Sequence, residues 1–357
     1  MAPSHDGDEP NLQAAIPEEG GGGLRFGDRR FHGPAVGFVF ALLLLALTVP
    51  PLLLRLRSSP PPETPAVTAR DSVAPPEVAI AAVRVARPET LRYHIERLRQ
   101  TRLWELPRDD FIQPVLFDRY PAEAGKLSDI PTKKRLFLHT LLPAALVAVN
   151  EIRQERARLD AILDEIDRCG GPGTTDDDFD TSASFNACLA PEEMEFLDNL
   201  CRKYRSRSLE QLRRRVNILP VSLIMAQGAL ESSWGGSRFA SSANNIFGMW
   251  TWDEDGMVPR AREEGKLHKI RTYESILDSV RHYLLTINRH EAYNPLRMIR
   301  LQTFDSLALT EGLTLYSERG GDYIEDLKEV IRYNNLQRYD RYRLARMPEP
   351  ANNEARP

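Results

Sequence analysis

Residues Leu219–Trp250 read LPVSLIMAQGALESSWGGSRFASSANNIFGMW, and this stretch decides the fold prediction. Pro220 suits the first turn of a helix, because proline lacks an N–H that the helix start leaves unpaired anyway. Apolar and small residues recur at helical spacing after it, and Gly235 and Gly236 are expected to stop the helix. We therefore predict a buried, closely packed helix that carries Glu231 in its last turn.

The position of Glu231 predicts a carboxyl group with a raised pKa. Apolar surroundings penalise the ionised form, and so does the negative end of the helix dipole. A carboxyl group that stays protonated near neutral pH is what a glycosidase needs to protonate a leaving oxygen. Position alone favours a solvated glutamate at a helix end. The neighbouring residues favour a catalytic one.

Aromatic and amide side chains are dense around Glu231. Flat aromatic faces pack on sugar rings, and amides bond to hydroxyl and acetamido groups, so this composition is typical of a sugar-binding cleft. Each aromatic residue alone is more often part of a core, so the argument depends on the density of the cluster. The predicted substrate-binding residues are Gln227, Ser232, Trp234, Asn244, Asn245, Phe247, Trp250 and Tyr273.

The motifs in this stretch resemble those of the glucosaminidase superfamily. AQGALESSWGGSRFA is similar to its Ala-Gln-x-x-Leu-Glu-Ser helix, and NNIFGMW to its Asn-Asn-x-Phe-Gly segment. The stretches IRTYESILDSVRHYLLTINRHEAY and YSERGGDYIEDLKEVI resemble its remaining blocks. With the upstream helix KKRLFLHTLLPAALVAVNEIR, the order of motifs most resembles Bax-like proteins.

This resemblance implies a lysozyme-like, mainly helical fold with a small β lobe. It also implies cleavage of β-1,4 bonds beside N-acetylglucosamine in the glycan strands of peptidoglycan. Glu231 matches the family's catalytic acid, and Tyr316 matches the tyrosine that faces it across the cleft.

The second catalytic carboxylate of the predicted site has more than one candidate. In related enzymes it lies on the β lobe, which here falls between Trp252 and Tyr273. We assign Glu264, with Glu263 and then the acidic run 253–255 as alternatives. With two carboxylates the second activates water, and with one the substrate's 2-acetamido group acts as the nucleophile. Neither route requires a metal or an organic cofactor.

Two other functions stay open. A wall-binding scaffold would keep the cleft and lose hydrolysis, whereas a lytic transglycosylase would use one helix-borne glutamate and leave an anhydro sugar. The pair Glu231 and Tyr316 favours an enzyme over a scaffold. The block 244–248 favours the glucosaminidase branch over the transglycosylase.

The residues before position 81 predict a membrane anchor and a linker. Residues 1–33 are rich in Gly, Asp and Pro and predict a disordered cytoplasmic tail. Residues 35–54 form an uninterrupted apolar run long enough to span a bilayer, with no cleavage site after it. Residues 55–80 form a Pro-rich linker. A weak arginine bias predicts a single-pass protein of the bacterial inner membrane with its soluble part in the periplasm.

The rest of the chain divides into a helical extension (81–205), a glucosaminidase domain (206–345) and a disordered tail (346–357). Within the extension we predict one long helix from Thr132 to Arg168, kinked at Pro143. Further predicted helices and short strands are 191–205, 209–216, Met249–Trp252 and His268–Tyr273.

The composition of the chain argues against some classes of binding partner. The net charge of −4 and the absence of a basic stretch argue against nucleic acid. The sequence has no CxxC pair and no HExxH spacing, so a metal site is not predicted. Two states of the cysteines stay open: a Cys169–Cys188 disulfide with Cys201 free, or three reduced thiols. No protein partner can be named.

Overall fold

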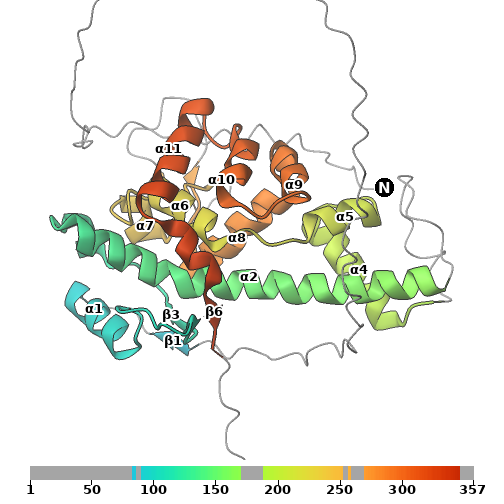
Figure 1. The fold of residues 1–357 in the computed structure, drawn as a ribbon, viewed down its shortest axis with the longest axis horizontal. Coiled ribbons are helices and arrows are strands. Elements are labelled where there is room, and N and C mark those ends of the chain that lie inside the picture. The colour runs from blue at the N-terminus through green and yellow to red at the C-terminus, as the bar shows by residue number, and fades with distance from the viewer. Residues whose placement is uncertain (1–82, 86–89, 170–187, 252–255, 259–268, 346–357) are drawn as a thin grey trace, which may run out of the picture. The chain divides into compact units, whose positions relative to one another are not determined.

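The computed structural model describes residues 83–85, 90–169, 188–251, 256–258 and 269–345 (Figure 1). These residues belong to one compact unit. The predicted cytoplasmic tail, membrane span and C-terminal tail lie outside the described residues.

The helix α2 (Ile130–Arg168) is the longest element, with 39 residues. Its first turn is capped by Asp129, whose carboxylate accepts a hydrogen bond from the Thr132 amide at 2.9 Å. The long helix predicted from the apolar spacing is confirmed, and it continues through Pro143 as one helix. Among the described residues, α2 alone is long and apolar enough to cross a membrane. Its most apolar window is 83% buried inside the fold, so core packing accounts for that apolarity.

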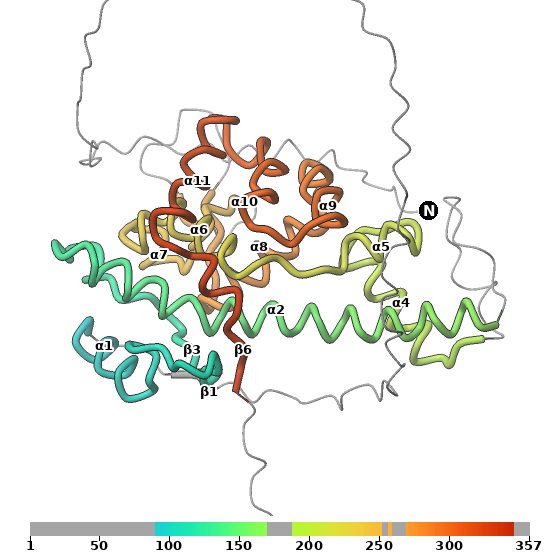
Figure 2. Tube along the Cα trace, in the orientation of Figure 1, coloured from blue at the N-terminus to red at the C-terminus, as the bar shows by residue number. Residues whose placement is uncertain are grey.

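The elements lie on two sides of α2. Figures 1 and 2 place α6 (Val221–Glu231), α8 (Ile276–Arg289) and α11 (Gly321–Tyr333) on one side, and α1 (Leu91–Gln100) on the other. A single hydrophobic core includes residues of α1, of the first half of α2 and of the domain helices. The predicted extension and the predicted domain therefore share one core.

The helix α6 is the centre of that core. Every residue from Val221 to Ala229 is buried. The Cβ that Gly228 lacks would lie 3.1 Å from side-chain atoms of Leu141 and Ile246, so glycine permits α2 to approach closely. At its N-terminus, the Asp340 carboxylate accepts hydrogen bonds from the Ser222 amide (2.8 Å) and hydroxyl (2.7 Å). A carboxylate at this end also suits the helix dipole.

A second, smaller apolar cluster lies at the far end of α2. It joins the last turns of α2 to α4 (Pro191–Tyr204) and α5 (Leu209–Arg215), which confirms the two helices predicted there. The thiols of Cys169 and Cys188 interact, and this contact raises the pKa of Cys169 to about 11. All three cysteines are free in this structure.

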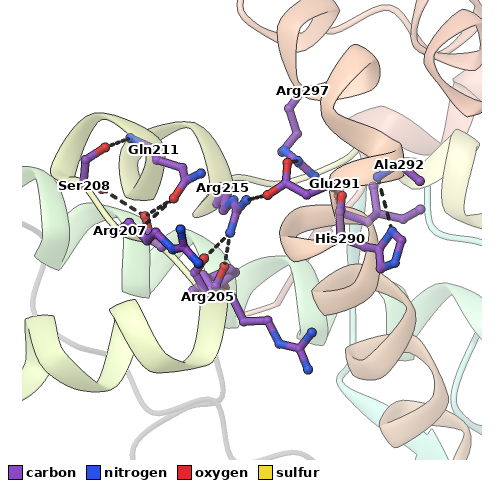
Figure 3. Close-up of polar contacts among 12 residues, drawn as sticks. Arg205, Arg207, Ser208, Gln211, Arg215, His290, Glu291, Ala292 and Arg297 are labelled. Atoms are coloured by element: carbon purple, nitrogen blue, oxygen red, sulfur yellow. Dashed lines mark hydrogen bonds and ion pairs between the residues drawn. The ribbon is translucent and has the colours of Figure 1, made fainter. Parts of the chain in front are cut away.

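Buried arginines join this second cluster to the rest of the fold (Figure 3). Arg215 donates hydrogen bonds to the last carbonyls of α4, and Arg297 donates to the Ile287 and His290 carbonyls at the end of α8. Arg300 donates to a carbonyl in the last turn of α5 at 2.9 Å. Each cation thus satisfies carbonyls that a helix end leaves unpaired and suits the negative end of the dipole. Glu291 forms ion pairs with Arg215 and Arg297.

The remaining helical elements of the domain are short. They are α7 (Arg238–Ala243), η2 (Glu291–Tyr293), α9 (Asn294–Arg300), α10 (Ser306–Leu309), η3 (Thr310–Leu313) and η4 (Leu336–Arg341). In the extension, η1 (Ala122–Lys126) precedes α2.

Three two-stranded sheets complete the described fold. Strands β4 (Trp250–Thr251) and β5 (Lys269–Ile270) lie within the two predicted short stretches, and they pair antiparallel with Trp250 opposite Ile270. The parallel pair β1 (Val83–Val85) and β3 (Val115–Phe117) lies within the extension. The parallel pair β2 (Phe111–Ile112) and β6 (Arg343–Leu344) joins the extension to the end of the domain. The mainly helical class is confirmed.

Candidate active site

Glu231 is the last residue of α6, and a tight turn follows it. The helix ends before the glycines that were expected to stop it, because Ser232 closes the last turn. The Ser232 hydroxyl donates to the Gly228 carbonyl and accepts a hydrogen bond from the Gly235 amide at 2.8 Å. Ser232, predicted to bind substrate, is fully buried, so its side chain supports the turn rather than facing solvent.

The Glu231 carboxyl group has one enclosed oxygen and one that faces a glycine. Its Oε1 has no hydrogen-bond partner among the described residues. Its Oε2 lies 3.5 Å from where a Cβ on Gly248 would be. Burial raises the pKa of Glu231 from 4.5 to about 7, opposed by the Tyr323 hydroxyl and by the charge of Arg319. The carboxyl group is therefore largely protonated below neutral pH.

A directional chain of hydrogen bonds lies behind this carboxyl group. The Tyr283 hydroxyl donates to the Gln227 side-chain carbonyl, and the Gln227 amide nitrogen donates to the Tyr323 oxygen at 3.0 Å. Because that oxygen accepts from Gln227, the Tyr323 proton is available to Glu231, with which Tyr323 interacts. Gln227, predicted to touch substrate, is fully buried and acts within this chain.

Tyr316 lies in the same buried group of tyrosines. Its hydroxyl donates to the Phe247 carbonyl at 2.9 Å, and its ring stacks on Tyr323 with centroids 5.6 Å apart. Burial and the nearby Glu231 charge raise its pKa well above the ordinary value. Tyr316 thus holds the Phe247–Gly248 segment beside Glu231.

The predicted amide contacts, Asn244 and Asn245, hold backbone segments together. The Asn244 amide donates to the Tyr273 carbonyl at 3.1 Å, from a left-handed backbone conformation that asparagine tolerates (φ 52°). Asn245 donates to the Met249 carbonyl at 2.7 Å and accepts from the Met249 amide at 2.9 Å. Both side chains are 1% exposed, so they shape the loop that presents Gly248.

Of the aromatic residues predicted to bind substrate, two are buried and two are half-buried. Phe247 stacks on Tyr283 with centroids 4.1 Å apart, and Tyr273 is also buried. Trp234 and Trp250 are half-buried. The Lys134 ammonium already lies over the Trp234 ring, 4.6 Å from its centroid. Glu264, the assigned second carboxylate, lies outside the described residues.

Of the predicted site residues, the structure therefore brings Gln227, Phe247 and Tyr316 close to the Glu231 carboxyl group. It adds three residues that the sequence interpretation missed: Tyr283, Arg319 and Tyr323. A signal was present for two of them, because Arg319 and Tyr323 lie in the motif YSERGGDY that begins with Tyr316.

A cavity of about 590 Å³ lies elsewhere, in the extension, and contains none of these residues. Its charged lining mixes arginines with carboxylates, as on a solvated surface: Arg99, Arg102, Glu105, Arg108 and Asp109. Among the described residues, no group of three His, Cys, Asp or Glu side chains is placed to hold a metal ion. The site assignment thus depends on the surroundings of Glu231.

Comparison with known proteins shows which family part of this chain resembles. Residues 206–336 match the model of the glucosaminidase family, described as mannosyl-glycoprotein endo-beta-N-acetylglucosaminidase. This part of the chain is therefore similar to a glucosaminidase domain. Glu231, Gly248, Tyr316 and Tyr323 all lie within the matched range.

The chain is also similar to two known proteins. Protein bax of Escherichia coli K12 is 26% identical over 227 residues, which cover 58% of this chain and 74% of the relative. The catalytic domain of the autolysin Auto from Listeria monocytogenes is 22% identical, covers 40% of this chain and 79% of its own, and superposes with a TM-score of 0.25. The family match and the similarity to protein bax confirm the expected resemblance to Bax-like proteins of the glucosaminidase superfamily.

Proposed function

We propose that this protein is a peptidoglycan hydrolase that cleaves a β-1,4-glycosidic bond beside N-acetylglucosamine, with Glu231 as the general acid. The observation that supports this most is the Glu231 carboxyl group, whose pKa burial raises to about 7 inside a glucosaminidase domain. An acid with a pKa near the working pH is both protonated and able to give up its proton.

In the proposed reaction, Glu231 gives its proton to the glycosidic oxygen as the bond to the sugar carbon breaks. The carboxylate that forms is stabilised by the Tyr323 hydroxyl and the Arg319 charge, the two groups that oppose the rise of its pKa. Gly248 leaves the space in front of Oε2 free of a side chain, so that a sugar oxygen can approach.

The second half of the reaction needs a nucleophile at the sugar carbon. The described groups that shift the pKa of Glu231 include no carboxylate. We propose Glu264 as the group that activates water. The substrate's own 2-acetamido group is the alternative, and it needs no second carboxylate.

Product analysis of purified peptidoglycan by mass spectrometry tests the function. The full chain in detergent should release fragments with reducing N-acetylglucosamine ends. Anhydro sugars would instead identify a lytic transglycosylase. Binding without release would identify a scaffold. Two variants accompany the wild type: Glu231→Gln, which lacks the proposed acid, and Glu329→Gln, its matched control, which changes an exposed glutamate on α11.

A further inference from the structure

We infer that Tyr120 and Lys134 of the helical extension are positioning residues for Glu231. The extension therefore contributes to catalysis by the glucosaminidase domain. The inference rests on the proposed role of Glu231. It concerns the turn Ser232–Gly236, which follows Glu231 directly and which we call the acid turn.

The acid turn has an unfavourable backbone conformation. Ser233, Trp234 and Gly235 all have positive φ, at 50°, 59° and 74°. Two of these residues carry a Cβ, which the left-handed region disfavours. Such conformations persist where the surrounding structure determines them, and they concentrate at functional sites.

Tyr120 contacts the acid turn at its glycine. A Cβ on Gly235 would lie 2.3 Å from Tyr120 Cε1, so the ring lies directly against the glycine backbone. The Tyr120 ring is 2% exposed and meets Phe137 of α2 edge-on, with centroids 6.0 Å apart. Phe137 in turn meets Trp234 at 6.1 Å. Aromatic rings of the extension thus contact two of the three residues with positive φ.

The first turns of α2 hold the acid turn from another direction. The Lys134 ammonium lies between two rings, 4.6 Å from the Trp234 centroid and 5.0 Å from that of Tyr333. It also donates a hydrogen bond to Asn334 at 2.8 Å. The ammonium of its neighbour Lys133 would be 2.7 Å from a Cβ on Gly236. Lys134 therefore ties the acid turn to the end of α11 as well as to the extension.

These contacts determine where α6 ends, and with it the place of the carboxyl group. Loosening the acid turn should admit water to Glu231 and lower its raised pKa, because burial is the main cause of the rise. The carboxyl group would also leave its productive position, which reduces kcat more than substrate binding.

The test compares four variants of the full chain in detergent: Tyr120→Ala, Tyr120→Phe, Lys134→Met and Lys134→Arg. For Tyr120→Ala and Lys134→Met, kcat should fall about 10- to 100-fold with KM little changed. The alkaline midpoint of kcat/KM should move down by about one pH unit. Tyr120→Phe should behave as wild type, because the Tyr120 hydroxyl has no partner among the described residues. Lys134→Arg should restore most of the activity, since it keeps a cation over Trp234.

Lys126→Met, an exposed lysine of η1, is the matched control and should change neither parameter. If Tyr120→Ala does not fold, Lys134→Met alone carries the test. Folded variants with wild-type kcat and an unshifted pH profile would overturn the inference.

A readout without activity separates this inference from the proposed function. The pH dependence of the melting temperature is compared between each protein and its Glu231→Gln version, which reports the pKa of Glu231 in the fold. Lys134→Met should lower that pKa even if the protein cleaves nothing. An unchanged pKa in the folded variant would contradict the positioning role directly.

Discussion

The Gln227 amide donates a hydrogen bond to the Tyr323 hydroxyl at 3.0 Å, and this contact leaves the Tyr323 proton for Glu231. Tyr323 therefore lowers the pKa of Glu231 against the effect of burial. Replacing Tyr323 by Phe should raise that pKa further. The alkaline limb of the kcat/KM profile should then move up by about one pH unit, because the acid stays protonated longer.

The matched control for Tyr323→Phe is Tyr93→Phe, since Tyr93 also lies on a helix, α1, and is exposed. The loss of an acceptor for Gln227 should also destabilise the fold by about 1–3 kcal/mol. A pH profile with the wild-type midpoint in folded Tyr323→Phe would show that this hydroxyl does not act on the acid.

Gly248→Ala tests whether the space before the carboxyl group is needed. The new methyl group would be 3.5 Å from Glu231 Oε2, an ordinary contact, so the pKa of Glu231 should change little. The backbone has φ 66°, and the strain should destabilise the fold by about 1 kcal/mol. The value of kcat/KM should fall by roughly 10²-fold, because the methyl group stands where the sugar oxygen approaches.

Gly321→Ala is the control for Gly248→Ala. A Cβ there meets no atom within 4 Å, and its φ is not positive. Equal steady-state kinetics for the two alanine variants would show that substrate does not approach Glu231 past Gly248.

The stability of Glu231→Gln should depend on pH with a definite sign. The folded protein holds the Glu231 proton up to a pKa of about 7, whereas the unfolded chain loses it near 4.5. Between these two values the unfolded chain gives up the proton that the fold retains, so stability falls as pH rises through this window; glutamine does not ionise and escapes the loss. The variant should be more stable than wild type above pH 7, by on the order of 3 kcal/mol, and equal to it below about pH 4.5.

Calorimetric melting of wild type, Glu231→Gln and Glu329→Gln across this pH range checks the stability prediction. Glu329 is exposed, so its variant should follow wild type throughout. A constant difference between wild type and Glu231→Gln at all pH values would mean that the carboxyl group has an ordinary pKa.

The main helices and the strands β4 and β5 were predictable from the sequence, whereas the parallel strand pairs were not, for a physical reason. Helices α2 and α6 bury a face or a whole surface with residues close in sequence, so their spacing is visible locally. The strands β2 and β6 contain two residues each and pair across more than half of the chain, as with Ile112 and Leu344. Such pairing depends on tertiary structure, which local pattern does not report.

In the candidate site, too, some features were predictable from the sequence and others were not. The raised pKa of Glu231 followed from its place in an apolar helix, and burial is its main cause in the structure. Composition could not separate amides that line a cleft from amides that hold a loop, and Asn244 and Asn245 are of the second kind. The contact of Lys134 with Trp234 was also out of reach, because it joins segments that are distant in sequence.

The predicted membrane topology has its own test. Residues 35–54 form an uncharged apolar run with arginines on both sides, and the proposed substrate lies outside the cytoplasmic membrane. An alkaline phosphatase reporter fused after Pro357 should therefore be active, and a cytoplasmic reporter at the same place should not. The reverse pattern would contradict the orientation and, with it, the wall substrate.

The central claim is that Glu231 is the proton donor for cleavage of peptidoglycan. Its most direct test is the rate of muropeptide release from purified peptidoglycan by wild type and Glu231→Gln, with melting temperature as the check on folding. The account predicts that the variant folds, still binds fragments and releases muropeptides at least ~10²-fold more slowly, the lower end for acid–base catalysis. Near-normal release by folded Glu231→Gln would contradict the claim.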